Sequence, residues 1–390
     1  MENLRKEALE PNPIREKLKE LIQQTLQEAL EAELEEFLGY SKYERTKKDN
    51  YRNGYTTKTV KTDVGEIEID TPRDRNGEFK PKILPKRQTM IDDLENKIVA
   101  LYAKGMSTRD IQELLSDMYG MDISTSLISK ITDRLLPKIE EWLSRTLDKI
   151  YAVIYIDGIV YKVKQEGKVV QKVVNVVIGI NTEGKKELLG FWISETESAS
   201  FWLKVLNDIK SRGVEDVLIF SVDGLSGISK AIHNVYPKAD IQKCIVHQVR
   251  NSLKYVPWKD RKQVAKDLKE VYQAPTVELA RVKLEEFKEK WSEKYPHIAI
   301  SWETNWDELM TYFDYPEEIR KLLYTTNIIE SVNSKLRKAT EGKKVFPSDE
   351  SLLKSLYMVA VELEKKWEKR PITDWGIIYG QLTLKFEGRI

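Results

Sequence analysis

The chain has 390 residues, which exceeds the usual size of a domain with a single hydrophobic core, so several domains are expected. Charged residues make up 33% of it, but Lys and Arg (64) nearly balance Asp and Glu (63), so a DNA-binding function needs local segregation of charge. A single cysteine, Cys244, excludes a disulfide framework and a cysteine-based zinc module. No apolar run reaches the roughly 18 residues of a membrane span, and no signal peptide is evident, so we expect a cytoplasmic protein without membrane contact.

Residues 1–40 are dominated by one amphipathic pattern. Apolar side chains recur at helical spacing over 14–38, and Gly39 provides a stop. One interpretation is a helix packed on its own domain. The other is a dimerisation helix, because little nearby sequence could cover such a long apolar stripe. Both stay open at this point.

Residues 41–88 change character. Within 41–62, Lys and Arg residues are interleaved with Tyr43, Tyr51 and Tyr55, a composition that suits a phosphate backbone with stacking. We expect this region, including Arg52, to contact DNA; a solvated loop is the alternative. Strand alternation after it, followed by turn signals, predicts short strands.

Residues 89–148 have the pattern of a helical module. One amphipathic helix ends near Gly105, and a second begins at Ser107, with an acid three residues later. A third helix is expected from about Thr125, and it would present Lys130 to solvent. Two short helices around a turn, the second with a polar face, predict a helix-turn-helix-like DNA-binding domain. An ordinary helical bundle would give the same pattern.

From residue 149 the pattern becomes α/β. Three strands joined by turns at 165–167 and 182–184 precede strands that alternate with helices up to 256, which predicts a mixed sheet covered by helices. Residues 257–322 read as an all-helical insertion rich in tryptophan. We expect these tryptophans to be mainly core, with base stacking by one of them as the alternative. Residues 323–370 predict two more helices, and 371–390 form a carboxyl-terminal tail.

Three acids occupy unusual positions. Asp157 lies within the apolar segment YAVIYIDGIVYKV, where Asp-Gly is either a hairpin turn or a costly buried carboxylate that needs a partner. Asp223 ends another apolar strand, where open α/β sheets place their sites, although a helix cap is the simpler explanation. Glu330 heads a polar helical stripe that includes Asn327, Asn333 and Arg337.

Together these segments resemble a known family. The motifs YIDG, SVDGLSGISKAI, CIVHQVRN and YTTNIIESVNSKLRK, the segment VFPSDESLLK and the tryptophan-rich stretch before Glu330 resemble the mutator-type DDE transposases of bacterial insertion sequences. The resemblance extends from about Tyr51 to Trp367. It implies a ribonuclease H-like mixed sheet interrupted by the helical insertion, in 149–256 and 323–370.

The resemblance also implies an activity. Asp157, Asp223 and Glu330 would hold two Mg²⁺ ions, with Mn²⁺ as a substitute, for cleavage and strand transfer of DNA. The partners would be transposon ends, target DNA and at least a second copy of the chain, in the nucleoid-associated cytoplasm of a bacterium. Besides Arg52 and Lys130, we expect DNA contacts from the following residues: His247, Arg250, Asn327, Asn333, Lys335, Arg337, Lys338, Lys343 and Lys344.

Two other functions stay open. One is a non-catalytic DNA-binding regulator on a transposase scaffold, and the other is a ribonuclease H-like nuclease without strand transfer. His247 has two interpretations as well. It is either a structural histidine or, as the resemblance implies, a residue that shapes the site or contacts DNA near Asp223.

Overall fold

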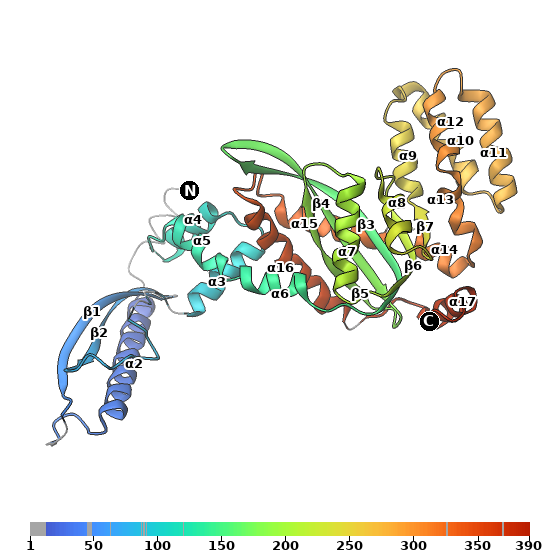
Figure 1. The fold of residues 1–390 in the computed structure, drawn as a ribbon. Coiled ribbons are helices and arrows are strands. Elements are labelled where there is room, and N and C mark those ends of the chain that lie inside the picture. Colours follow the sequence, from blue (N-terminus) through green and yellow to red (C-terminus); the bar gives the residue numbers. More distant parts are fainter. Residues whose placement is uncertain are drawn as a thin grey trace. The chain divides into compact units, whose positions relative to one another are not determined.

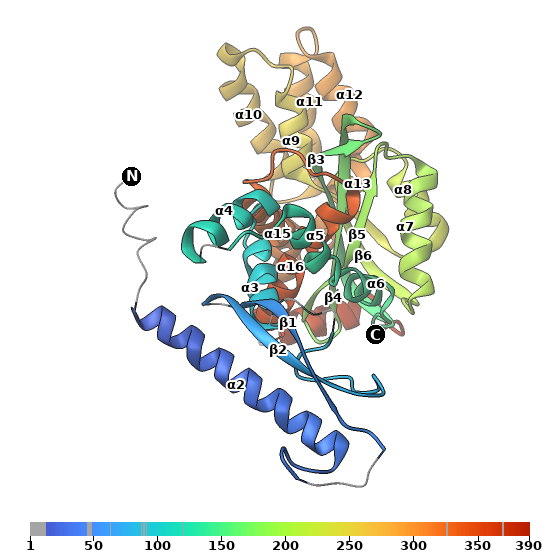
Figure 2. The ribbon, with the colours of Figure 1, turned by 90° about the vertical axis from the view of Figure 1, so that its left-hand side faces the viewer.

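A computed structural model describes residues 13–390 except 45–48, 63, 87, 89, 91, 120, 325, 326 and 369 (Figures 1 and 2). The chain divides into two compact units, Met1–Leu135 and Leu136–Ile390. Each unit buries hydrophobic clusters of its own. Within the described ranges, no helix combines the length and the apolar character that crossing a membrane requires.

The first unit begins with a helix laid on a hairpin (Figure 1). Helix α2 (Pro13–Leu38) packs against the antiparallel strands β1 (Arg52–Thr62) and β2 (Gly65–Asp74). Its inner residue Leu30 is fully buried in a cluster with Val60, Ile67, Ile69 and Leu84. The apolar stripe is therefore covered by its own domain along this face. Two apolar residues near the start of α2 stay outside that cover, since Leu18 is 42% exposed and Leu21 is 59% exposed.

Three helices complete the first unit: α3 (Asp92–Ala103), α4 (Thr108–Tyr119) and α5 (Thr125–Asp133). They share one buried cluster that includes Leu94, Ile111 and Ile128. At the start of α4, Ser107 and Asp110 exchange hydrogen bonds of 2.9 and 3.2 Å, and at the start of α5 the Ser124 hydroxyl accepts from the Leu127 amide at 3.2 Å. These caps explain why the helices begin where the sequence predicts.

The second unit begins with α6 (Leu136–Ser144) and is built on a five-stranded sheet. The strands lie in the order β5-β4-β3-β6-β7, and their bounds are β3 Ile150–Gln165, β4 Lys168–Asn181, β5 Lys186–Ser194, β6 Asp216–Val222 and β7 Asp240–Lys243. Strands β3, β4 and β5 pair antiparallel, whereas β3 with β6 and β6 with β7 pair parallel. The expected meander followed by crossover strands is thus confirmed as a mixed sheet.

Helices cover both faces of this sheet (Figure 2). One face packs on α7 (Ala199–Ser211) and α8 (Ile228–Val235), and the other packs on α6, α14 (Glu317–Tyr324), α15 (Asn327–Thr340), α16 (Asp349–Trp367) and α17 (Trp375–Lys385). Successive residues of β3 serve the two faces in turn, with Tyr155 in one cluster and Ile154 and Ile156 in the other. Burial on both faces explains why β3 reads as a nearly continuous apolar run.

A separate helical cluster lies beyond β7 (Figure 1). It consists of α9 (Ile245–Leu253), α10 (Trp258–Tyr272), α11 (Val277–Trp291), α12 (Pro296–Thr304), α13 (Trp306–Met310) and the 3₁₀ turn η1 (Thr311–Asp314). Trp291 and Trp302 belong to its buried core, as expected. Trp258 is the exception, because it is 86% exposed.

Late segments of the chain are tied back to the sheet. In the loop between α15 and α16, Phe346 accepts a hydrogen bond from the Lys164 amide and donates one to the Lys162 carbonyl, both at 2.8 Å. At the other end of the chain, the Arg389 guanidinium forms two hydrogen bonds with the Asp216 carboxylate, at 2.8 and 2.9 Å. These contacts fix the α15–α16 loop along β3 and the carboxyl-terminal tail at the start of β6.

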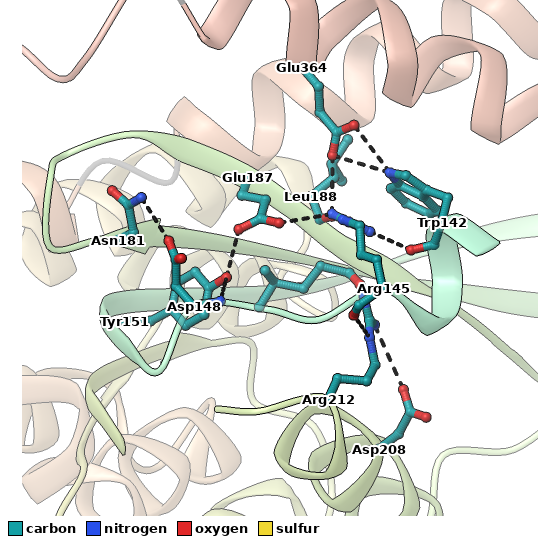
Figure 3. A network of polar contacts seen from close by, with 11 residues as sticks. Trp142, Arg145, Asp148, Tyr151, Asn181, Glu187, Leu188, Asp208, Arg212 and Glu364 are labelled. Carbon is teal, nitrogen blue, oxygen red and sulfur yellow. Dashed lines mark hydrogen bonds and ion pairs between the residues drawn. The ribbon is translucent and has the colours of Figure 1, made fainter. Parts of the chain in front are cut away.

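A polar network centred on Arg145 joins three layers of the second unit (Figure 3). The Arg145 guanidinium pairs with Glu187 of β5 at 3.1 Å and with Glu364 of α16 at 3.3 Å. It also donates to the Trp142 carbonyl at 2.6 Å and lies over the Trp142 ring. Burial raises the pKa of the Glu364 carboxyl group, so the arginine compensates a charge that the fold would otherwise disfavour.

Candidate active site

Asp157 lies within β3 and not in a turn. The strand continues through Asp157 and Gly158, and the chain reverses only at Glu166 and Gly167, where φ is 49° and 80°. The Asp157 side chain is buried, with 6% of the residue exposed. A side chain at position 158 would bring its Cβ within 2.9 Å of Val173 Cγ1, so the close approach of β4 explains the glycine beside the acid.

Asp223 directly follows β6, the strand next to Asp157. The parallel register pairs Ile156 with Val222, and an aspartate follows each of these two residues. Burial, followed by the charge of Asp223, raises the pKa of the Asp157 carboxyl group from 3.8 to about 7. Two adjacent carboxylates of this kind favour a shared proton or a bound cation.

His247 holds Asp223 from the other side. The Cys244 amide donates to the Val222 carbonyl at 2.8 Å, which places the start of α9 next to Asp223. From α9, the His247 Nδ1 forms an ion pair with the Asp223 carboxylate. Hydrogen bonds to Asp223 and Cys244 raise the pKa of His247 to about 10, so the imidazole is charged at neutral pH.

The potential ligand atoms of Asp223, Cys244 and His247 lie within 4.8 Å of one another. These three side chains could hold a metal ion, but in this structure His247 Nδ1 is paired with the Asp223 carboxylate. This geometry fits a role in which His247 orients the Asp223 carboxylate. Of the two sequence-based interpretations of His247, this geometry favours the one in which the residue shapes the site near Asp223.

Glu330 reaches this region through two helices. It lies in the first turn of α15, and one turn later the Asn333 amide donates a hydrogen bond to Asp157 Oδ2. Glu330 Oε1 lies 3.6 Å from Arg250 Nη2 on α9. Arg250 is one helical turn from His247, which contacts Asp223.

These contacts connect the three acids through helices α15 and α9. Asp157 is joined to Asn333, Glu330 to Arg250, and His247 to Asp223, while α15 and α9 each contribute two residues one turn apart. The contacts therefore link Glu330 to the two aspartates indirectly, through Asn333 on the same helix and through Arg250 and His247 on α9.

Sequence reasoning missed a further acid close to Asp223. Glu197 precedes α7, and both burial and the charge of Asp223 raise the pKa of its carboxyl group, while the Asn175 amide lowers it. Glu197 Oε1 and Asn175 Oδ1 both lie beside Gly158. The only signal in the sequence is an acid before the Ser198 cap of a helix, which is too common to be informative.

The expected DNA contacts fall into different environments. Lys130, Lys335, Arg337, Lys338 and Lys344 are exposed, and the Arg250 side chain is 63% exposed. Lys343 is half-buried and donates to Ser355 Oγ at 3.0 Å. Asn333 differs most from the expectation, since it is 1% exposed and its amide is bonded to Asp157. The Asn327 side chain lies outside the described part of the structure.

Some basic side chains of residues 41–62 form contacts within the protein. Arg52 pairs with Glu31 at 2.6 Å and with Glu35 at 3.1 Å, both on α2. The Lys58 ammonium donates to the carbonyls of Leu84 and Pro85 at 3.3 and 2.9 Å. These side chains join α2 and the loop after β2 to the hairpin. Residues 45, 47 and 48 of this region lie outside the described residues.

The chain is similar to known proteins over most of its length. Residues 2–370 match the family model described as "Transposase, Mutator family". The chain is 42% identical over 359 residues to a probable transposase for an ISRM3-like insertion sequence element of Sinorhizobium fredii, with 90% of each chain covered. It is 41% identical over 359 residues, again with 90% coverage of both chains, to the transposase for ISRM3 of Rhizobium meliloti.

A more distant relative gives the same result. The chain is 35% identical over 352 residues to the transposase for insertion sequence element IS1201 of Lactobacillus helveticus, covering 90% of this chain and 95% of the relative. Among solved structures, a Drosophila P element transposase strand transfer complex has 10% identity and a TM-score of 0.36, over 70% of this chain and 93% of that one, a similarity too low to define a fold. The family match and the sequence relatives agree over most of the chain. The chain therefore belongs to the Mutator family of transposases.

Proposed function

We propose that this chain binds the ends of its insertion sequence and catalyses Mg²⁺-dependent cleavage and strand transfer of DNA, with Asp157, Asp223 and Glu330 as the metal ligands. Membership of a transposase family supports DNA cutting and joining in general. The observation that supports the finer proposal is the set of contacts that links Glu330 to Asp157 through Asn333 and to Asp223 through Arg250 and His247.

The residues around Asp157 and Asp223 are suited to bind a divalent cation. The candidate ligands are carboxylate oxygens, the hard donors that Mg²⁺ and Mn²⁺ prefer. The raised pKa of Asp157 beside Asp223 marks a position where a cation would relieve repulsion between the two carboxylates. When bound, two such ions would activate the attacking oxygen and stabilise the leaving oxygen of the phosphodiester.

The protein's own residues would prepare this site in two ways. Asn333 fixes the Asp157 carboxylate, and His247 fixes that of Asp223, so both are oriented before DNA arrives. Arg250, Lys335, Arg337, Lys338 and Lys344 are exposed on or after helices α9 and α15 and would hold phosphates near the acids.

We also propose a ribonuclease H-like catalytic domain and a helix-turn-helix-like DNA-binding module for this chain. The antiparallel meander and the two parallel strands that follow, with Asp157 within β3 and Asp223 directly after β6, support a ribonuclease H-like catalytic domain interrupted by the α9–η1 insertion. Helices α3, α4 and α5, with Lys130 exposed, support end recognition by a helix-turn-helix-like module. These DNA substrates place the protein in the nucleoid-associated cytoplasm of a bacterium.

One assay separates this proposal from the two alternatives. The protein is incubated with labelled end DNA, a target plasmid and Mg²⁺, and joined product is measured for the wild type and for Asp223→Asn. We expect joined product only from the wild type, with end binding retained by the variant. Binding without cleavage by the wild type would identify a regulator, and cleavage without joining would identify a nuclease. Joining by Asp223→Asn would reject the assignment of the acids.

A further inference from the structure

The loop between β5 and α7 carries two acids with different environments. Glu195 has an exposed side chain (54%) at the outer limit of contact with Lys172, 4.0 Å away. Glu197, two residues later, turns toward the sheet, where the Asp223 charge acts on it. The loop therefore delivers one solvent-facing and one site-facing carboxylate.

The position of Glu197 is defined by its distance from Gly158. A Cβ built on Gly158 would lie 3.4 Å from Glu197 Oε1 and 3.5 Å from Asn175 Oδ1. Gly158 directly follows Asp157, and its amide donates to Asp157 Oδ1 at 2.7 Å. The absence of a side chain at 158 thus leaves space for Glu197 against β3, within reach of the Asp223 charge.

Two oxygens in this space lack partners. Asn175 is fully buried, yet its Oδ1 has no hydrogen-bond donor, and the buried Oε1 of Glu197 also has none among the described residues. Across the site, the buried Asn333 presents a third such oxygen, Oδ1. Buried oxygens without donors are costly, and a cation or its bound water would satisfy them.

We propose that Glu197 is a fourth carboxylate of the cation site and that its Oε1 binds the divalent cation held by Asp157 and Asp223. Asn175 would position Glu197 from β4, opposite Gly158 in the strand register. This inference rests on the proposed function, because it assigns a further ligand to the same site.

Cation binding is the direct test. Binding of Mn²⁺ is titrated by the electron paramagnetic resonance signal of the free ion, at neutral pH and without DNA, for the wild type, Glu197→Gln, Glu197→Asp and Glu195→Gln. We expect Glu197→Gln to weaken binding about tenfold, as loss of a metal-orienting group commonly does. Glu195→Gln is the matched control from the same loop and should bind as the wild type does.

The Glu197→Asp variant separates coordination from charge alone. It keeps the negative charge but shortens the side chain, so a ligand role predicts weaker binding than in the wild type. Wild-type affinity in Glu197→Asp, or in Glu197→Gln, would overturn the inference.

An Asp157→Asn variant keeps the two hypotheses apart. If the wild type binds Mn²⁺ and Asp157→Asn does not, the main site stands whatever Glu197 does. Equal binding by the wild type and Asp157→Asn would overturn the proposed site and the further inference together.

Discussion

The Asn333 amide, one turn after Glu330 on α15, donates a hydrogen bond to Asp157, which lies 176 positions earlier in the chain. This bond connects the helix that carries one candidate ligand with the strand that carries another. It also explains why the polar stripe on α15 contains an amide at a buried position.

Asn333→Ala tests this positioning. We expect strand transfer to fall about tenfold to a hundredfold, as is typical when a residue that orients a metal ligand is removed. Mn²⁺ affinity should fall as well, whereas end binding measured by gel shift should be unchanged. Ser334→Ala, at the exposed neighbouring position, is the control. Normal cation affinity in Asn333→Ala would show that the bond does not position Asp157.

The pH dependence of stability follows from Asp157. Its pKa is about 7 in the folded protein and 3.8 in the absence of the fold, so between these values the folded state binds more protons than the unfolded state. The free energy of unfolding of the metal-free protein should therefore decrease as pH rises through this window. Thermal unfolding measured across the window checks this.

Two further measurements complete that experiment. Added Mg²⁺ should restore stability, most strongly at the upper end of the window, because there the proton no longer competes for the site. Asp157→Asn should flatten the slope. The same slope in Asp157→Asn would assign the effect to other groups.

Arg145→Met tests the polar network of Figure 3. The substitution leaves Glu364 and Glu187 without their shared cation, and the pairs are partly shielded, with side chains 23% to 27% exposed. We expect a loss of about 2 kcal/mol in the free energy of unfolding, measured by urea denaturation, after allowance for that exposure. Lys149→Met, which breaks the exposed pair with Glu215, should leave the free energy of unfolding nearly unchanged. Equal changes in the free energy of unfolding for Arg145→Met and Lys149→Met would show that the network stabilises the fold no more than an exposed ion pair does.

Trp258 is the candidate for base stacking in the insertion, because its side chain is exposed while Trp291 and Trp302 are core. Trp258→Ala should weaken binding of end DNA about tenfold, since stacking on an aromatic side chain contributes about 1–3 kcal/mol. The melting temperature should not change. Ile300→Ala, another exposed apolar residue of the insertion, should bind normally. Normal binding by Trp258→Ala would reject the stacking role.

A dimer is expected because transposition joins two ends, and α2 retains exposed leucines after packing on its hairpin. Leu21→Glu should reduce the mass measured by light scattering from that of a dimer to that of a monomer. Leu384→Glu, at an exposed position of α17, should leave the mass unchanged. A dimer that persists in Leu21→Glu would exclude this face.

The sequence predicted the elements well where local patterns determine them. The turns at Gly167 and Gly184 and the cap at Ser107 depend on near neighbours, so the sequence predicted them. Asp157 was ambiguous, because an Asp-Gly pair is equally suited to a hairpin, and only the pairing of β3 with β4 and β6 decides for a strand.

The parts of the site that were missed depend on contacts between distant segments. Asn333 was expected to face DNA, but its burial results from the packing of α15 on β3. Glu197 had no distinguishing pattern, because its environment comes from Gly158 and Asn175 on other strands. The packing of α2 on β1 and β2 was one of two open interpretations, since alternating strand residues do not reveal which helix they pack against.

The insertion between β7 and α14 determines the order in which the site is completed. Asp157, Glu197 and Asp223 precede the insertion, His247 lies in its first helix α9, and Glu330 and Asn333 follow it. During synthesis, the strand that bears Asp157 exists long before the helix that holds it. A chain that stops within the insertion would keep the candidate end-binding helices α3, α4 and α5 but carry only part of the acid set. If helices α3, α4 and α5 bind the ends as proposed, such a fragment would occupy DNA ends without cutting them, and premature termination would yield an inhibitor of the full-length enzyme.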